Sequence, residues 1–289
     1  QFSRASERCF VTQPTLSMQV KKAEEQLGHA VFDRGSSPLS LTPYGVEVIP
    51  ILREILSENE NLRLLNDRMA GRIKEEIRVG IIPTVSVYLL TRLFTLFSRV
   101  LPNVRFLYIE HPTETLLQEL EKGTIDFGIL AGPFQQAKFR MVPLYTEEIE
   151  VYTGLGMNGG IEVSALDGEQ PWLLSKGNCL RTQVINFCNI SESAEAPSWD
   201  YIGGNMDLLV EMVNVNGGYT LLPAEYKSTK EQQGFRKSLA SPYGYPAREI
   251  IGVFPQRSYK TPHMERMIKE IQLAYPRKRD APLHILDWK

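Results

Sequence analysis

Residues 11–28 read VTQPTLSMQVKKAEEQLG, and their pattern predicts how the N-terminal part of the chain folds. Thr12 is a favourable N-cap residue, and Pro14 is tolerated in a first helical turn. Gly28 ends a run in which apolar residues recur at helical spacing, namely Leu16, Val20, Ala23 and Leu27. Because residues 2–10 also have a helical pattern, the sequence predicts a helix, a tight turn and a second helix.

The second helix has a polar outer face, formed by Gln13, Thr15, Ser17, Met18, Lys21 and Lys22. Amide and hydroxyl groups can hydrogen-bond to the edges of DNA bases, and ammonium groups can pair with phosphates. We therefore interpret Gln13, Thr15, Ser17, Lys21 and Lys22 as DNA-binding residues. An ordinary solvated helix face is the alternative, and charge alone favours it.

A β-hairpin is predicted after the second helix. The strand-like residues 31–34 and 39–41 flank the turn-forming sequence GSSP at residues 35–38. A hairpin next to a helix-turn-helix forms a wing. Arg34 lies at its tip, where a guanidinium can reach a minor groove or a phosphate.

A long helix is predicted from Thr42-Pro43 to about Met69. An apolar residue recurs every seven positions along it, at Val48, Ile55, Leu62 and Met69. Such a heptad seam favours pairing with a second copy of the chain. The alternative is that this helix packs against its own chain.

Strands and helices alternate through the rest of the chain. Residues 77–82, 104–110 and 125–130 are strand-like and are separated by helical patterns, which predicts a parallel sheet. A second unit, with a strand at 171–175, is expected between the crossing strands 148–154 and 248–254. Ligands of parallel sheets gather at the carboxyl ends of the strands, where Pro83-Thr84 and Pro112-Thr113 fall.

The composition excludes some classes of protein. The net charge of the 289 residues is −2, so contact with nucleic acid requires a local basic face. Neither a membrane-spanning run nor a signal peptide is expected. Three cysteines without an export signal indicate a reducing cytoplasm. The chain begins at Gln1 within a helical pattern, so we expect a preceding N-terminal segment.

Two of the cysteines lie close together, in GNCLRTQVINFC at residues 177–188. If this run is helical, the Cα atoms of Cys179 and Cys188 are roughly 13 Å apart, whereas a disulfide requires about 5.5–6 Å. The pair can therefore bond only if the segment changes shape. An Asn178 cap and the positive charge of Arg181 would lower the pKa of Cys179 and favour a reactive thiolate.

The other candidate groups are expected to be structural. Cys9 is predicted to be packed in the core of the N-terminal unit. The histidines lack the paired spacing of metal ligands, so neither a metal nor a cofactor is expected; they are His29, His111, His263 and His284.

Short motifs of the N-terminal part keep a fixed order and spacing: Phe2-Ser3-Arg4-Ala5, Thr12-Gln13-Pro14-Thr15-Leu16-Ser17, Lys22-Ala23-Glu24, Leu27-Gly28, Phe32-Asp33-Arg34 and Leu41-Thr42-Pro43-Tyr44-Gly45. With these motifs the chain resembles the LysR-type transcriptional regulators. The resemblance implies an α/β protein with three parts. They are a winged helix-turn-helix truncated at its start (residues 1–44), a linker and dimerisation helix (45–71), and a two-lobed regulatory domain similar to periplasmic binding proteins (72–289). It also implies that double-stranded DNA, a second copy in a homodimer or homotetramer, and RNA polymerase are partners, and that the protein is not an enzyme.

The cysteine segment carries a narrower resemblance. Cys179-Leu180-Arg181-Thr182-Gln183 and Phe187-Cys188 are similar in spacing to the redox segment of the peroxide sensors of this family, the OxyR branch. The resemblance implies that hydrogen peroxide is the signal, that Cys179 is oxidised to a sulfenic acid, and that Cys188 condenses with it to a disulfide. The implied peroxide pocket consists of Thr84, Thr113, Asn178, Arg181 and Arg248.

One residue departs from that pattern. Peroxide sensors usually carry a histidine where Asn178 stands, and an asparagine cannot shuttle a proton, so a different reaction rate is expected. Two other functions remain open. One is a LysR-type regulator that senses a small molecule or an anion between its lobes, and the other, less favoured, is a thiol peroxidase.

Overall fold

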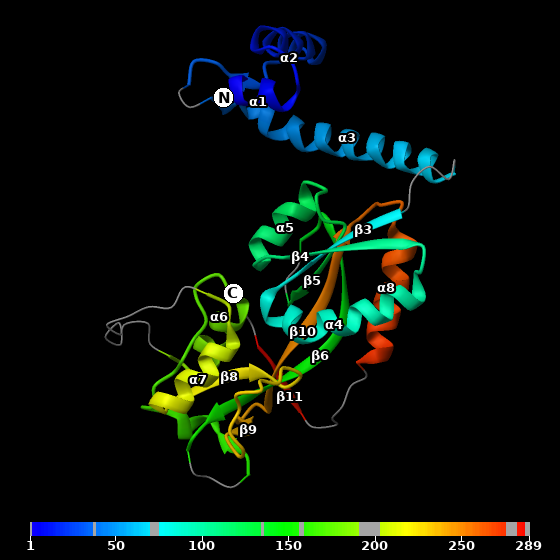
Figure 1. Ribbon diagram of the computed structural model, residues 1–289. Coiled ribbons are helices and arrows are strands. Elements are labelled where there is room, and N and C mark those ends of the chain that lie inside the picture. Colours follow the sequence, from blue (N-terminus) through cyan, green and yellow to red (C-terminus); the bar gives the residue numbers. More distant parts are fainter. Residues whose placement is uncertain are drawn as a thin grey trace. The chain divides into compact units, whose positions relative to one another are not determined.

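The computed structural model describes residues 2–36, 39–69, 75–133, 136–155, 159–190, 203–275 and 282–286. The chain divides into two compact units, Gln1–Ala70 and Gly71–Lys289 (Figure 1). Among the described residues, no helix is both long and apolar enough to span a membrane.

The first unit contains the predicted helix-turn-helix and hairpin. Its elements are α1 (Phe2–Arg8), α2 (Gln13–Leu27), β1 (Phe32–Asp33), β2 (Ser40–Leu41) and α3 (Pro43–Met69). The Thr12 side chain accepts a hydrogen bond from the N–H of Thr15, and Gly28 ends α2 with a φ of 74°, a left-handed conformation that favours glycine. The caps expected from the sequence are therefore confirmed.

Glu24 connects α2 to the hairpin through hydrogen bonds and an ion pair. Its carboxylate accepts hydrogen bonds from the backbone N–H groups of Val31 and Phe32 and pairs with Arg34 at 2.9 Å. Burial alone would raise the pKa of Glu24, but these N–H groups and the charge of Arg34 together hold it below its usual value.

The apolar seam of α3 is only partly exposed. Val48 is 7% exposed and belongs to the core of its own unit. Ile55 and Leu62 are more than half exposed, as is Ile51 beside them. The side chain of Met69, the last predicted seam position, lies outside the described residues. An exposed apolar stripe therefore begins after the first seam position.

The second unit is built on a mixed sheet. Its strands are β3 (Glu75–Ile81), β4 (Val104–Glu110), β5 (Phe127–Ala131), β6 (Phe139–Thr153), β7 (Ile161–Glu162), β8 (Tyr219–Pro223), β9 (Arg236–Ala240), β10 (Tyr245–Pro255) and β11 (Leu283–Ile285). The order along the sheet is β4-β3-β5-β10-β6-β9-β7, with β8 on β6 and β11 on β10. Strands β3, β4 and β5 are parallel as predicted, whereas β10 runs antiparallel to β5 and β6.

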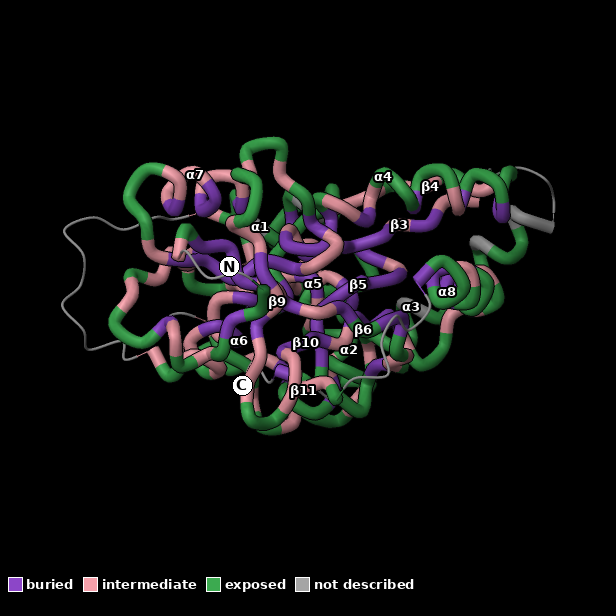
Figure 2. The backbone as a smooth tube through the Cα atoms, turned by 90° about the horizontal axis from the view of Figure 1, so that it is seen from below, coloured by how far each residue is buried: buried purple, intermediate pink, exposed green. Residues whose placement is uncertain are grey.

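The helices of this unit are α4 (Pro83–Val100), α5 (Thr113–Glu121), α6 (Cys179–Phe187), α7 (Met206–Asn216) and α8 (Thr261–Ala274), with a short 3-10 helix at Val163–Leu166. Buried residues follow the central strands β3 and β5, whereas α8 carries many exposed residues (Figure 2).

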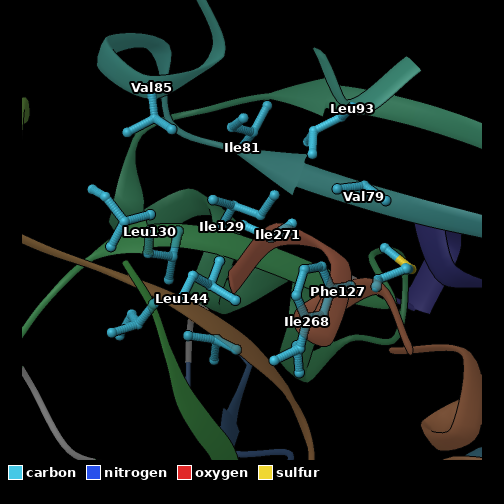
Figure 3. Packing of buried hydrophobic residues seen from close by; sticks show 14 of the residues in the cluster. Val79, Ile81, Val85, Leu93, Phe127, Ile129, Leu130, Leu144, Ile268 and Ile271 are labelled. Atoms are coloured by element: carbon cyan, nitrogen blue, oxygen red, sulfur yellow. The ribbon is translucent and has the colours of Figure 1, made fainter. Parts of the chain in front are cut away.

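Two hydrophobic cores define two lobes. The first core gathers residues of β3, β5, α4, α5 and α8, and Figure 3 shows part of it, around Ile81, Phe127 and Ile271. The second core gathers residues of α6, α7 and β8, among them Leu180, Val210 and Leu222. Strand β6 contributes Leu144 to the first core and Val151 to the second, so it crosses between the lobes. The mixed α/β architecture with two lobes joined by crossing strands is thus confirmed.

Two predictions of secondary structure were incomplete or wrong. Residues 171–175 do not form a strand, because only Pro171 makes a ladder contact, a single bridge to Tyr219. The C-terminal residues contain a strand that the sequence analysis did not place. This strand, β11, pairs in parallel with β10, and Leu286 after it is 3% exposed in the second core.

Truncation of Leu286 tests whether the C-terminal strand is part of the fold. Leu286→Ala is expected to lower the free energy of unfolding by about 2–5 kcal/mol, because it leaves a cavity in the second core. Denaturant unfolding followed by circular dichroism measures the change. Leu273→Ala is the matched control, since Leu273 is 67% exposed on α8. Equal stability of the two variants would show that the strand does not contribute to the core.

Candidate functional site

Thr84 and Thr113 lie at the carboxyl ends of neighbouring parallel strands. Strands β3 and β4 end opposite each other at Ile81 and Glu110, and each is followed by a proline and then by the threonine. Thr84 and Thr113 are each 2% exposed, in the first turns of α4 and α5. The position predicted for these two hydroxyl groups is therefore confirmed.

Cys179 is brought to Thr113 by the first turn of α6. Its Sγ lies 2.8 Å from Thr113 Oγ1 in a buried hydrogen bond. Cys179 is 8% exposed and belongs to the first core, whereas the next residue, Leu180, belongs to the second. The N-terminus of α6 thus lies where the two cores meet.

Arg248 is held on Thr84 from the crossing strand β10. Its Nη1 donates to Thr84 Oγ1 at 3.0 Å and its Nη2 to the Thr84 carbonyl at 3.1 Å. The side chain is completely buried and forms an ion pair with Glu147 of β6, whose carboxylate also accepts a hydrogen bond from Tyr88. Burial raises the pKa of Glu147, while the charge of Arg248 opposes that rise.

The pKa of Cys179 is not lowered as the sequence analysis predicted. Burial raises it above its usual value, and this effect outweighs the hydrogen bond from Thr113 and the charge of Arg248, which both favour the thiolate. The nearby carboxylate of Glu114 also raises it. The prediction failed because it considered the helix N-terminus without the hydrophobic core that covers the thiol.

Asn178 and Arg181 both hydrogen-bond to the loop before α6. Asn178 occupies the N-cap position of α6, but its side chain makes no capping bond and instead donates to the carbonyl and hydroxyl of Ser175. Arg181 donates from Nη1 to the Leu174 carbonyl at 2.9 Å. Both side chains therefore fix the loop before α6, and the cation whose charge favours the Cys179 thiolate is Arg248.

Cys188 lies at the other end of α6, in a separate environment. It is half-buried against the second core, and both cysteines are free thiols. Burial raises the pKa of Cys188 to about 11, although a hydrogen bond with Tyr219 lowers it in part. Since α6 is helical from Cys179 to Phe187, the Cα atoms of the pair lie about 13 Å apart. In this conformation the two cysteines are therefore too far apart to form a disulfide, as predicted.

Glu147 was not among the site residues predicted from the sequence. The alternation along β6 gives a signal for it, because Glu147 is in phase with the buried residues Tyr145, Ile149 and Val151. A carboxylate on the apolar side of a strand requires a buried partner. In the part of the chain that the structure describes, no group of three or more His, Cys, Asp or Glu side chains can hold a metal ion.

The predicted DNA-binding residues differ in accessibility. Gln13, Lys21 and Lys22 are exposed on α2, whereas Thr15 and Ser17 are only partly accessible. Lys21 lies 3.8 Å from Glu25, and both side chains are largely exposed. Arg34 is turned back onto α2 by its ion pair with Glu24.

Two residues of the turn before α2 were misjudged or missed. Cys9 is exposed, so its predicted place in the core is wrong, because the chain leaves α1 at this residue. Phe10 has a φ of 55°, and its side chain is 96% exposed. No sequence motif had predicted this exposed aromatic residue.

Replacement of Thr113 tests the hydrogen bond to the thiol. Thr113→Val is expected to raise the pKa of Cys179 further, because it removes the hydroxyl group that stabilises the thiolate. A rise of about one unit lowers the thiolate fraction about tenfold at neutral pH. The rate of alkylation by iodoacetamide, measured against pH with Cys9→Ser and Cys188→Ser in the background, reports this change. An unchanged pH profile would show that the bond does not influence the thiol.

The family follows from comparison with known proteins. The LysR substrate binding domain family matches residues 70–275, and the family described as bacterial regulatory helix-turn-helix protein, lysR family, matches residues 1–46. The hydrogen peroxide-inducible genes activator of Pectobacterium carotovorum subsp. carotovorum is 31% identical over 227 residues, which are 77% of this chain and 74% of that protein.

Two further relatives carry the name OxyR. The DNA-binding transcriptional dual regulator OxyR of Escherichia coli (strain K12) is 30% identical over 227 residues, again 77% of this chain and 74% of that protein. A structure of full-length OxyR from Pseudomonas aeruginosa, with one cysteine replaced by aspartate, has a TM-score of 0.69 and 28% identity. The match covers 94% of this chain and 92% of that one. The chain therefore belongs to the LysR family of bacterial helix-turn-helix proteins, which are transcription regulators rather than enzymes.

Proposed function

We propose that this protein is a transcription regulator that senses hydrogen peroxide through a reversible disulfide between Cys179 and Cys188. The observation that supports it most is the buried cluster in which Thr113 contacts Cys179 while Arg248 is held on Thr84. The relatives named as hydrogen peroxide-inducible activators support the same signal.

The chemistry begins at Cys179. The thiol loses its proton, and the resulting thiolate attacks one oxygen of the peroxide; the O–O bond breaks, and the leaving hydroxide takes up a proton to become water. Cys179 is then a sulfenic acid. The Thr113 hydroxyl and the charge of Arg248 favour the thiolate, which burial disfavours. The site is thus a thiol at rest, and the thiolate is its minor form.

The second step needs a change in α6. The Cys188 thiolate attacks the sulfur of the sulfenic acid, the S–O bond breaks, and the oxygen leaves as water. The balance is two thiols and one peroxide giving one disulfide and two waters. Because the two cysteines lie at opposite ends of a helix and in contact with different cores, the disulfide requires α6 to unwind and Cys188 to leave the second core.

The change in α6 would alter DNA binding by the N-terminal unit. We propose that Gln13, Thr15, Ser17, Lys21, Lys22 and Arg34 contact double-stranded DNA through the winged unit. To contact DNA, Arg34 would either break its ion pair with Glu24 or contact a phosphate while it remains paired. The exposed apolar residues Ile55 and Leu62 of α3 favour a homodimer or a higher homo-oligomer. A regulator of this kind acts at promoters in the cytoplasm, next to RNA polymerase.

A peroxide titration tests the proposal. Reduced protein is treated with increasing hydrogen peroxide, and the free thiols and the remaining peroxide are both counted. Loss of two thiols per peroxide, with no further consumption, supports the sensor. Continued turnover with a dithiol reductant, at a rate far above that at which the reductant alone consumes peroxide or reduces the disulfide, would indicate a thiol peroxidase. Retention of all thiols would reject the peroxide sensor and favour a regulator that binds a small molecule or an anion.

A further inference from the structure

The cluster around Cys179 contains a buried charge pair, of which the oxidation step as proposed uses only the arginine. Arg248 and Glu147 come from the two strands that cross between the lobes, and their side chains are 0% and 1% exposed. Glu147 Oε1 accepts a hydrogen bond from Nε of Arg248, and both Nη atoms of Arg248 donate to Thr84. The guanidinium is therefore fixed on two sides, by a carboxylate and by the threonine of the cluster.

The carboxylate has its own support. Tyr88 of α4 donates to Glu147 Oε2 at 2.7 Å, and the Tyr88 and Tyr145 hydroxyl groups lie 2.8 Å apart. Tyr145 is stacked on Tyr275 at 4.5 Å between ring centroids. These contacts hold Glu147 in one position from α4 and β6, so the orientation of Arg248 depends on it.

Burial raises the pKa of Cys179, and two nearby charges modify that effect. Arg248 is the cation that favours the Cys179 thiolate, and Glu114 of α5 disfavours it. A guanidinium paired with a carboxylate acts on its surroundings as a dipole, whose field falls off faster than that of a single charge. The carboxylate of Glu147 thus limits the effect of the Arg248 charge on Cys179.

We propose that Glu147 is a positioning residue for Cys179, because its carboxylate holds the Arg248 guanidinium on Thr84 and offsets the positive charge that acts on the thiol. This inference rests on the proposed function, since it assigns the control of reactivity at the same site. Glu147 itself need not contact the peroxide.

The decisive variant is Glu147→Gln. It keeps an oxygen that can accept from Arg248 and removes the negative charge. With Cys9→Ser and Cys188→Ser in the background, Cys179 is the only thiol, and its alkylation by iodoacetamide is measured against pH. The half-point of that profile is expected to fall by about one unit, which gives about tenfold faster alkylation below it. Glu150→Gln is the matched control, because Glu150 lies on the same strand but pairs with Arg236.

A half-point that stays in place or rises in Glu147→Gln would overturn the inference. If this variant does not fold, the same measurement on Tyr88→Phe tests the inference. It removes only the hydroxyl group that donates to Glu147, so the carboxylate ionises less readily and the half-point is expected to move the same way by a smaller amount. An unchanged profile in a folded Tyr88→Phe would then reject the role of Glu147.

Hydrogen peroxide provides the second readout, which separates this inference from the proposed function. If peroxide fails to oxidise Cys179 while Glu147→Gln still shifts the alkylation profile, the proposed function fails and the role of Glu147 stands. If peroxide oxidises Cys179 while the profile does not move, the sensor stands and Glu147 has no part in it.

Discussion

Replacement of Cys179 by serine is expected to abolish thiol oxidation at near-stoichiometric hydrogen peroxide. A serine hydroxyl does not form the anion that attacks peroxide near neutral pH, whereas Cys179 has a hydroxyl partner at 2.8 Å and the charge of Arg248 to favour its thiolate. Cys188 is not expected to take over, because burial raises its pKa to about 11. Cys188 should therefore stay reduced over the time in which the unmodified protein loses the free thiols of both Cys179 and Cys188.

The partner variant separates the two steps. In Cys188→Ser the first step is retained and the second is blocked, so a sulfenic acid at Cys179 should persist and be trapped by dimedone. Cys9→Ser is the control, since Cys9 is an exposed thiol of the other unit and takes no part in either step. Equal peroxide reactivity in the unmodified protein and in Cys179→Ser would reject the roles assigned to the two cysteines.

Replacement of Arg248 by methionine is expected to have the largest effect on stability. The variant keeps much of the apolar stem but leaves Glu147 as a buried carboxylate without its ion-pair partner. Breaking such a pair costs about 3–5 kcal/mol in the free energy of unfolding. In the folded fraction of this variant the pKa of Cys179 is also expected to be higher, because the cation that favours its thiolate has been removed.

Two further variants distinguish the loss of the pair from the loss of the arginine. The double variant Arg248→Met with Glu147→Leu removes both charges and should recover a large part of the stability. Arg140→Met is the exposed control, because the Arg140–Glu265 pair has side chains that are 45% and 51% exposed, and its loss should cost less than about 1 kcal/mol. If Arg248→Met were as stable as Arg140→Met, the buried pair would not contribute as described.

The parts of the fold that depend on local sequence were predictable. The start and end of α2 follow from Thr12 and Gly28, which act within their own turn. Thr84 and Thr113 could be placed together because each follows a strand of the same parallel sheet. The distance between the cysteines followed from helical geometry alone, since α6 covers almost the whole segment between them.

The electrostatics of the site could not be predicted in the same way. The pKa of Cys179 is raised by a core assembled from α4, α5 and α8, which no local pattern reveals. Glu147 and Arg248 are 101 residues apart in sequence, and their pairing depends on how β6 and β10 align. The short strand β11 pairs with the start of β10, at Tyr245–Ala247, which β5 leaves uncovered, and no local pattern gives this pairing.

The disulfide itself is tested most directly by peptide mapping. The Cys9→Ser protein is reduced, treated with one equivalent of hydrogen peroxide, alkylated, digested and analysed by mass spectrometry. The proposed mechanism predicts a cross-linked species that contains Cys179 and Cys188, and the return of both free thiols after reduction. Recovery of Cys179 and Cys188 as separately alkylated thiols after peroxide treatment would contradict it.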